Sequence, residues 1–217
     1  VALADPNQSL EDLHKAAKQS VSDKNLDAAL EQYKDIYGKD PKSVDALFNI
    51  GWIYNEQKKF DTAARWLKKA ADLDAQNARV QSELGFAYSK LNNPEGAVEA
   101  YTKATELKAD SAAVWVALGD VNYELKKDSK AAAAAYPKAV ERGTAGSATY
   151  YRLGWCLNDL NQFDKAAPQL KQAAALEPKS GAVWLEWGYS LLRAKKYEEA
   201  VQALTRATVL VPKERLS

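Results

Sequence analysis

The chain has 217 residues, of which 47% are hydrophobic and 27% are charged, a composition typical of a soluble globular protein. Its 30 basic and 29 acidic residues give a net charge of +1, which argues against nucleic acid or an anionic membrane as the main partner. No apolar run approaches the roughly 20 residues that span a bilayer, so no membrane span is expected.

The N-terminus and the cysteine content bear on processing and compartment. Methionine is absent from the sequence, even at position 1, so we expect a processed form or an excised fragment. Cys156 is the single cysteine, so no intramolecular disulfide can form. This fits a reducing compartment without requiring one, and both a cytoplasmic and a periplasmic location stay open.

The apolar pattern predicts six pairs of helices, each made of a first helix (helix A) and a second helix (helix B) joined by a short polar turn. Ser9 is a predicted N-cap for the first of them, and residues 1–9 form an N-terminal extension. The predicted A helices are 10–22, 44–57, 78–91, 112–126, 147–160 and 181–194. The predicted B helices are 26–38, 60–73, 94–107, 129–141, 163–176 and 197–210.

The helix pairs repeat with a nearly constant period. A glycine recurs at intervals of 34, 34, 35 and 34 residues, and an alanine follows each glycine by 19 residues, or by 20 in the long fourth repeat. The glycines are Gly51, Gly85, Gly119, Gly154 and Gly188. Six repeats result, covering 10–43, 44–77, 78–111, 112–146, 147–180 and 181–214. A period of this length is the signature of a stacked repeat architecture.

These landmarks resemble the tetratricopeptide repeat (TPR) family. Repeat 2 supplies the family's apolar, small and aromatic positions as Leu47, Ile50, Gly51, Tyr54, Ala63, Leu67 and Ala70. The resemblance implies an all-α fold, a right-handed α-solenoid superhelix of antiparallel helix pairs, with 10–217 as a single TPR domain. It also gives the glycine a role, since a small residue on helix A lets helix B pack closely. Substituting Gly51 with leucine should therefore overpack that contact, at a cost of about 1–3 kcal/mol.

Three features depart from the regular repeat. Pro137 and Pro168 fall inside B helices, on the outward face, where we expect local kinks without a break. We expect the extra residue of repeat 4 to lengthen the turn at 126–129. The last repeat leaves Val201, Leu204 and Val211 available, so its end is a predicted association site and a possible route to a homo-oligomer.

The sequence argues against an enzyme. His14 is the single histidine, and it lies in a different repeat from Cys156, so no Ser-His-Asp or Cys-His catalytic set can be assembled. A buried structural thiol is the more common role for a lone cysteine. No zinc-ligand spacing is present, and neither a cofactor nor a metal is expected.

The family resemblance also implies a ligand surface. Residues 5, 9 and 12 of each A helix face the concave groove of TPR proteins, and residues 2 and 6 lie nearby. The candidate peptide-binding residues are therefore Phe48, Asn49, Trp52, Asn55, Arg79, Phe86, Tyr123, Tyr151, Arg152, Trp155, Asn158 and Tyr189. A large ring at residue 9 can equally pack on the adjacent repeat. The row as a whole favours binding, because aromatic anchors are typical of binding grooves.

One ligand mode of the family is disfavoured. The clamp for a C-terminal carboxylate of a heat-shock chaperone needs basic and amide side chains at set positions, and Glu83 occupies a position that should be basic. The remaining groove has mixed charge and suits an extended or helical segment with apolar and aromatic anchors. Three hypotheses follow: a scaffold that binds a peptide segment of a partner protein, a repeat that self-associates through its C-terminal end, or a regulatory region of a larger protein.

Overall fold

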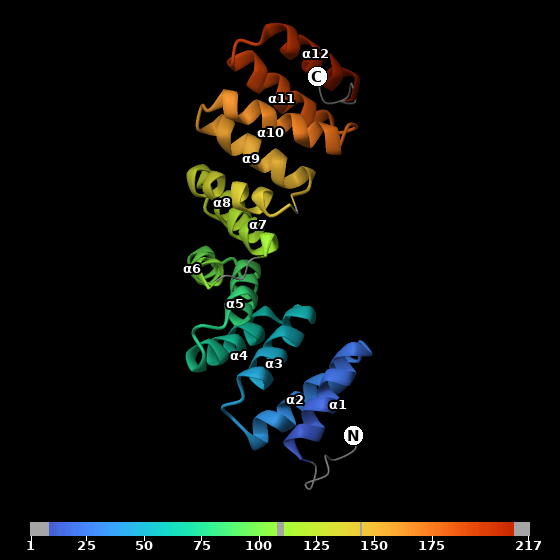
Figure 1. Ribbon diagram of the computed structural model, residues 1–217, viewed down its shortest axis with the longest axis vertical. Coiled ribbons are helices and arrows are strands. Elements are labelled where there is room, and N and C mark those ends of the chain that lie inside the picture. The colour runs from blue at the N-terminus through green and yellow to red at the C-terminus, as the bar shows by residue number, and fades with distance from the viewer. Residues whose placement is uncertain (1–8, 108–110, 144, 211–217) are drawn as a thin grey trace. The chain divides into compact units, whose positions relative to one another are not determined.

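The computed structural model describes residues 9–107, 111–143 and 145–210, and within them every regular element is a helix (Figure 1). The helices of the first half are α1 (Leu10–Ser22), α2 (Leu26–Lys39), α3 (Val44–Glu56), α4 (Phe60–Leu73), α5 (Ala78–Lys90) and α6 (Pro94–Glu106). Those of the second half are α7 (Ala112–Asp120), the π-helix η1 (Val121–Leu125), α8 (Ser129–Glu141), α9 (Ser147–Asp159), α10 (Phe163–Leu176), α11 (Gly181–Arg193) and α12 (Tyr197–Leu210). The predicted all-α array of helix pairs is confirmed.

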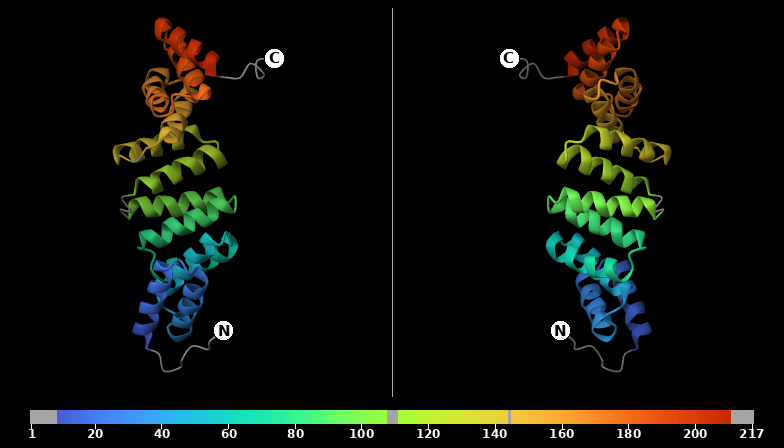
Figure 2. Two further views of the ribbon diagram at one scale, coloured as in Figure 1. Left: turned by 90° about the vertical axis from the view of Figure 1, so that its right-hand side faces the viewer. Right: turned by 90° about the vertical axis from the view of Figure 1, so that its left-hand side faces the viewer.

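The helices group into two compact units, residues 1–109 and residues 110–217. Each unit contains three A–B pairs, and the two helices of a pair lie side by side (Figure 2). That residues 10–217 act as one continuous domain stays a prediction. Residues 1–8 of the predicted N-terminal extension, and Val211, lie outside the described residues.

The turn between helix A and helix B has the same construction in the described repeats. Each turn has three residues, and the middle one has positive φ, as in Lys24 (58°) and Lys58 (59°). Around Lys24, the backbone N–H of Asn25 donates to the carbonyl of Ser20, and that of Lys24 donates to the carbonyl of Val21. This pair of bonds satisfies the last carbonyls of helix A and ends it.

Repeat 4 absorbs its extra residue inside helix A, so the prediction of a longer turn at 126–129 is wrong. The turn after η1 keeps three residues, while α7 and η1 together are one residue longer than the thirteen-residue A helices elsewhere. The N–H of Lys126 donates to the carbonyl of Val121, five residues earlier in the chain. At the equivalent place in repeat 2, the N–H of Gln57 donates to the carbonyl of Ile53, only four residues earlier. A π-type segment accommodates one inserted residue without breaking the helix.

The recurring glycine lies where helix B crosses helix A. A Cβ added at Gly51 would lie 2.5 Å from Cγ of Leu67, and one added at Gly119 would lie 2.5 Å from Cε1 of Tyr136. Both neighbours are fully buried side chains of helix B. The prediction that glycine permits close packing of the pair is therefore confirmed.

The two prolines lie inside continuous helices. Pro137 is in α8 and Pro168 is in α10, and neither helix is interrupted. Pro168 is exposed and Pro137 is partly exposed, as predicted for the outward face. An exposed position lets water satisfy the carbonyl that loses its helical donor at each proline.

Candidate functional site

The predicted binding residues divide between the two units, and each set is described by itself. The first unit holds Phe48, Asn49, Trp52, Asn55, Arg79 and Phe86. The second holds Tyr123, Tyr151, Arg152, Trp155, Asn158 and Tyr189.

Three of these residues are buried, so the prediction that they line an accessible surface is wrong. Phe48 is 7% exposed, Asn55 is 3% exposed and Asn158 is 7% exposed. The A helix of the following repeat covers them, which a pattern within one repeat does not reveal. Phe48 also carries the guanidinium of Arg79 over its ring, 4.6 Å from the centroid.

The two asparagines join consecutive repeats. Asn55 Nδ2 donates to Glu83 Oε2 at 2.8 Å, and Asn158 Nδ2 donates to Glu186 Oε2 at 3.2 Å. Asn158 Oδ1 accepts from Ser190 Oγ at 2.7 Å. Burial raises the pKa of Glu83 and of Glu186, and the hydrogen bond from each asparagine opposes that rise.

The rings at residue 9 of each A helix are partly used in packing. Phe86 meets Phe60 of the preceding repeat edge to face, with ring centroids 5.9 Å apart. Tyr189 meets Phe163 in the same way at 6.0 Å. Trp52 is partly buried against two apolar clusters of the first unit. These contacts favour the packing interpretation for individual rings, the alternative that the sequence left open. The remaining candidate of that unit, Asn49, donates Nδ2 to the carbonyl of Asp45 in its own helix, at 2.8 Å.

The second unit contains a hollow of about 400 Å³ on its A-helix side, which we call the tyrosine hollow. The side chains of Tyr123 and Tyr151 line it, with Glu124, Arg152 and Glu177. The ring of Tyr123 packs edge to face against the ring of Trp155, with centroids 5.3 Å apart and an interplanar angle of 83°. The structure thus brings together four of the predicted residues, Tyr123, Tyr151, Arg152 and Trp155, which belong to two consecutive repeats.

Arg152 is neutralised by neighbouring carboxylates. Its Nη1 donates to Asp120 Oδ1 at 2.8 Å and its Nη2 donates to Glu124 Oε1 at 2.7 Å. Tyr136 also donates its hydroxyl to Asp120 Oδ1, at 2.8 Å. Burial raises the pKa of Asp120, and these hydrogen bonds oppose the rise. The network holds Arg152 in place, so it is not available as a free cation.

Two further carboxyl groups make the hollow acidic. Glu177 lines it, and its Oε2 accepts from Ser147 Oγ at 3.0 Å. Glu186 acts electrostatically on both tyrosines and raises their pKa values, after the larger effect of burial. The site therefore combines four carboxyl groups with one arginine that is already paired. Sequence reasoning predicted a groove of mixed charge but missed Glu177, which follows the last residue of the B helix α10.

The single histidine and the single cysteine of the sequence lie in different units of the structure. His14 Nδ1 lies 3.2 Å from Asp45 Oδ2 in the first unit, and Cys156 is fully buried in the second. Burial raises the pKa of the Cys156 thiol to about 12, which makes it a poor nucleophile. No cluster of three or more potential metal ligands occurs within residues 9–107, 111–143 and 145–210. In these same ranges no helix is both long enough and apolar enough to cross a bilayer.

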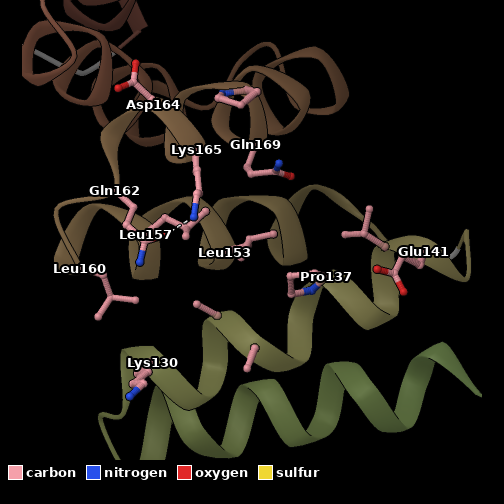
Figure 3. A pocket seen from close by; sticks show the side chains of 14 residues that line it. Lys130, Pro137, Glu141, Leu153, Leu157, Leu160, Gln162, Asp164, Lys165 and Gln169 are labelled. Carbon is pink, nitrogen blue, oxygen red and sulfur yellow. Dashed lines mark hydrogen bonds between the residues drawn. The ribbon is translucent and has the colours of Figure 1, made fainter.

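A second hollow of the same unit, of about 700 Å³, lies among α8, α9 and α10 (Figure 3). Leu153 and Leu157 of α9 form its floor, and both Pro137 and Pro168 line it. The Nζ of Lys165 at its rim donates to Gln162 Oε1 at 3.1 Å. The sequence signal for this hollow was the pair of outward prolines, which by themselves indicated only helix kinks.

Comparison with protein families agrees with this architecture. Two family models described as tetratricopeptide repeat match residues 20–85, 55–121 and 151–214. The chain belongs to the tetratricopeptide repeat family. Proteins of this family in general mediate protein–protein interactions.

Individual relatives are more distant. Small glutamine-rich tetratricopeptide repeat-containing protein 2 of Mycosarcoma maydis is 30% identical over 86 residues, which is 40% of this TPR chain and 24% of that protein. The match thus spans about a quarter of the relative's length. The structure of YrrB, a TPR protein with an unusual peptide-binding site, superposes with a TM-score of 0.77 at 20% identity, over 87% of this chain and 96% of YrrB. The structure of MamA from Desulfovibrio magneticus superposes with a TM-score of 0.64 at 21% identity, over 77% of this chain and 94% of the MamA chain. These likenesses show the fold.

Proposed function

We propose that this TPR protein is a non-catalytic interaction scaffold, and that its tyrosine hollow binds a peptide segment of a partner protein through a basic side chain. The observation that carries the proposal is the composition of the hollow. Two tyrosine rings lie beside Glu124 and Glu177, and the one arginine there is already paired with carboxylates.

The chemistry of the hollow suits a lysine or arginine side chain. An ammonium or guanidinium group over a tyrosine face gains about 0.5–2 kcal/mol, more when the site is shielded from water. The carboxylate of Glu177, which accepts a hydrogen bond from the neutral hydroxyl of Ser147, supplies the opposite charge at the same place. The volume of about 400 Å³ falls within the range of small ligand sites and fits one side chain with part of its backbone.

The family and its structures support a peptide as the ligand. TPR proteins mediate protein–protein interactions, and the similar structure of YrrB is described as having a peptide-binding site. A scaffold needs no nucleophile or metal. The buried thiol of Cys156 and its raised pKa agree with that assignment.

The test is a peptide-display selection with the purified chain as bait. We expect the native chain to enrich peptides that contain lysine or arginine beside an apolar residue. The variant Tyr123→Ala, Tyr151→Ala and the variant Glu124→Gln, Glu177→Gln should both lose this enrichment. Circular dichroism should show that both variants remain folded.

The matched control is Glu199→Gln, which removes an exposed carboxylate from α12 of the same unit. It should enrich the same peptides as the native chain. Preferential enrichment of acidic peptides by the native chain, or equal enrichment by the native chain and the folded double variants, would contradict the proposal.

A further inference from the structure

Repeat 4 is one residue longer than its neighbours between two landmarks of its A helix. The first landmark is the glycine that packs on helix B, and the second is the turn residue with positive φ. They lie eight positions apart in repeat 4, from Gly119 to Lys127, and seven apart in the other repeats that carry the glycine. The regular pairs are Gly51 and Lys58, Gly85 and Asn92, Gly154 and Asn161, and Gly188 and Lys195. The extra residue is absorbed in η1, a kind of segment that is frequent at functional sites.

Backbone hydrogen bonds show which residue of η1 takes which place. In repeat 2 the carbonyl of Tyr54, three positions after the glycine, accepts from the N–H of Lys59, five positions further on. The same carbonyl accepts in the same way in repeats 3, 5 and 6, where it belongs to Tyr88, Leu157 and Leu191. In repeat 4 the carbonyl of Asn122 accepts from Asp128, six positions further on, at 2.8 Å. Asn122 therefore occupies the place that Tyr54 has in repeat 2.

This place faces the B helices and not the tyrosine hollow. Tyr88 lines a hollow of the first unit with residues of the B helices α4 and α6. Leu157 lines the hollow among α8, α9 and α10 in the second unit. Asn122 is 5% exposed, and its Nδ2 donates to the carbonyl of Leu118 in its own helix at 2.9 Å. A tyrosine at the place of Asn122 would therefore be lost from the tyrosine hollow.

The extra residue allows two consecutive side chains, Tyr123 and Glu124, to reach the next A helix, α9. The ring of Tyr123 packs on Trp155, and Glu124 Oε1 accepts from Arg152 Nη2 at 2.7 Å. In repeat 5 a single residue, Asn158, makes the link to the following A helix. Since an α-helix turns by about 100° per residue, a regular A helix presents only one of two neighbours at this place.

The residue that Glu124 binds has the opposite charge from its counterparts. Residue 6 of the next A helix is Glu83 after repeat 2 and Glu186 after repeat 5, and an asparagine binds each of them. After repeat 4 it is Arg152, which binds Glu124 and Asp120. Two carboxylates on one guanidinium leave the surroundings acidic, and Glu124 supplies the second of them.

We propose that the extra residue of repeat 4 creates the tyrosine hollow and determines its specificity for a basic side chain. It does so by placing Tyr123 and Glu124 together beside α9, one as the aromatic surface and the other as the carboxylate that neutralises Arg152. This proposal rests on the proposed function and names the feature of the chain that sets its specificity. The extra residue acts through chain length and not through the side chain of Asn122.

The test uses two single-residue deletions, each of which restores the regular spacing from glycine to turn. Deletion of Asn122 should move Tyr123 to the place of Tyr54, away from the hollow, and leave Glu124 beside α9. Deletion of Leu125, the last residue of η1, should leave Tyr123 in the hollow and carry Glu124 away from its partner. The two deletions thus remove different halves of the site. Circular dichroism should show both variants folded, because the spacing is that of the other repeats.

The first readout needs no ligand. It is the nuclear Overhauser effect (NOE) between the ring protons of Tyr123 and Trp155, whose ring centroids lie 5.3 Å apart. The native chain and the variant lacking Leu125 should show this NOE, and the variant lacking Asn122 should not. The control Asn122→Leu keeps the chain length and introduces the residue that repeats 5 and 6 have at this place. It should be folded and should keep the NOE.

The second readout is the peptide-display selection with the same library. Each deletion should lower the enrichment of lysine and arginine peptides by roughly tenfold, because each removes one of the groups that recognise a cation. The control Asn122→Leu should enrich basic peptides as the native chain does. Loss of enrichment in both deletions, with the NOE lost only in the variant lacking Asn122, would support the proposal.

Three outcomes would overturn the proposal. The first is a folded variant lacking Asn122 that keeps the Tyr123–Trp155 NOE. The second is native enrichment of basic peptides by a folded deletion variant; if the variant lacking Asn122 does not fold, the variant lacking Leu125 decides this point. The third is a folded Asn122→Leu variant that loses the NOE, which would assign the placement to the amide side chain. A native chain that enriches no basic peptides, with every NOE result as expected, would instead overturn the proposed function and support the placement.

Discussion

Gly51 provides the sharpest test of how the helix pairs pack. It lies in the interior of α3, where alanine is favoured over glycine by about 0.5–1 kcal/mol on helix propensity alone. Propensity therefore predicts that Gly51→Ala stabilises the protein. The structure predicts the opposite, because the added Cβ would meet helix α4.

The magnitude follows from the contacts. The new Cβ would lie 2.5 Å from Leu67 Cγ, 2.9 Å from Leu67 Cδ2 and 3.3 Å from the carbonyl oxygen of Ala63. Carbon atoms normally pack about 3.5–4.0 Å apart, so the overlap with Leu67 is roughly 1 Å. Leu67 is fully buried and cannot swing into solvent. Overpacking of this kind costs about 1–3 kcal/mol, which leaves a net destabilisation of up to about 2.5 kcal/mol after the propensity gain of about 0.5–1 kcal/mol.

The assay is urea and thermal unfolding followed by circular dichroism. In a chain of this size each 1 kcal/mol shifts the melting temperature by roughly 2–4 °C. The matched control is Gly38→Ala in α2 of the same unit, where an added Cβ meets no atom within 4 Å. That variant should be as stable as the native chain or more stable. A Gly51→Ala variant that is as stable as Gly38→Ala would refute the close-packing argument.

Further predictions concern the bonds between repeats. Ser190→Ala should lower the free energy of unfolding by about 1–3 kcal/mol in urea titrations, because buried Asn158 Oδ1 loses its donor; an unchanged midpoint would contradict this. Ala87 occupies the equivalent position in repeat 3. Ala87→Ser should raise the free energy of unfolding by about 0.5–1.5 kcal/mol, because it offers a donor to buried Asn55 Oδ1, which has no partner among the described residues; a lower urea midpoint would count against this prediction. Burial raises the pKa of Glu186, so the folded state keeps this proton at pH values where the unfolded state has lost it, and stability falls as pH rises through the folded pKa. Glu186→Gln should therefore be more stable than the native chain at neutral pH, with a gain that shrinks as pH falls through the raised pKa of Glu186 and is absent below the ordinary carboxyl pKa; a pH-independent difference would argue against the reasoning.

Part of the candidate site could be predicted from the repeat pattern. The phase of the A helices placed Tyr123 and Tyr151 on one surface, and the structure brings both into the tyrosine hollow. The same phase placed Asn55 and Asn158 there, yet both are buried. Phase gives the direction of a side chain from its own helix, whereas burial depends on what the next repeat places over it.

The sequence by itself determined the local structure of this protein. Helical periodicity, polar turns and a glycine every 34 or 35 residues were enough to predict twelve helices and their pairing, since these signals act within one repeat. Only the tertiary structure decided the contacts between repeats. The bonds of Asn158 with Glu186 and Ser190 join residues 28 and 32 positions apart, and the insertion in repeat 4 became the π-type segment Val121–Leu125 so that its turn kept its geometry. Such outcomes depend on which side chains meet in space, and that is set by packing between helices.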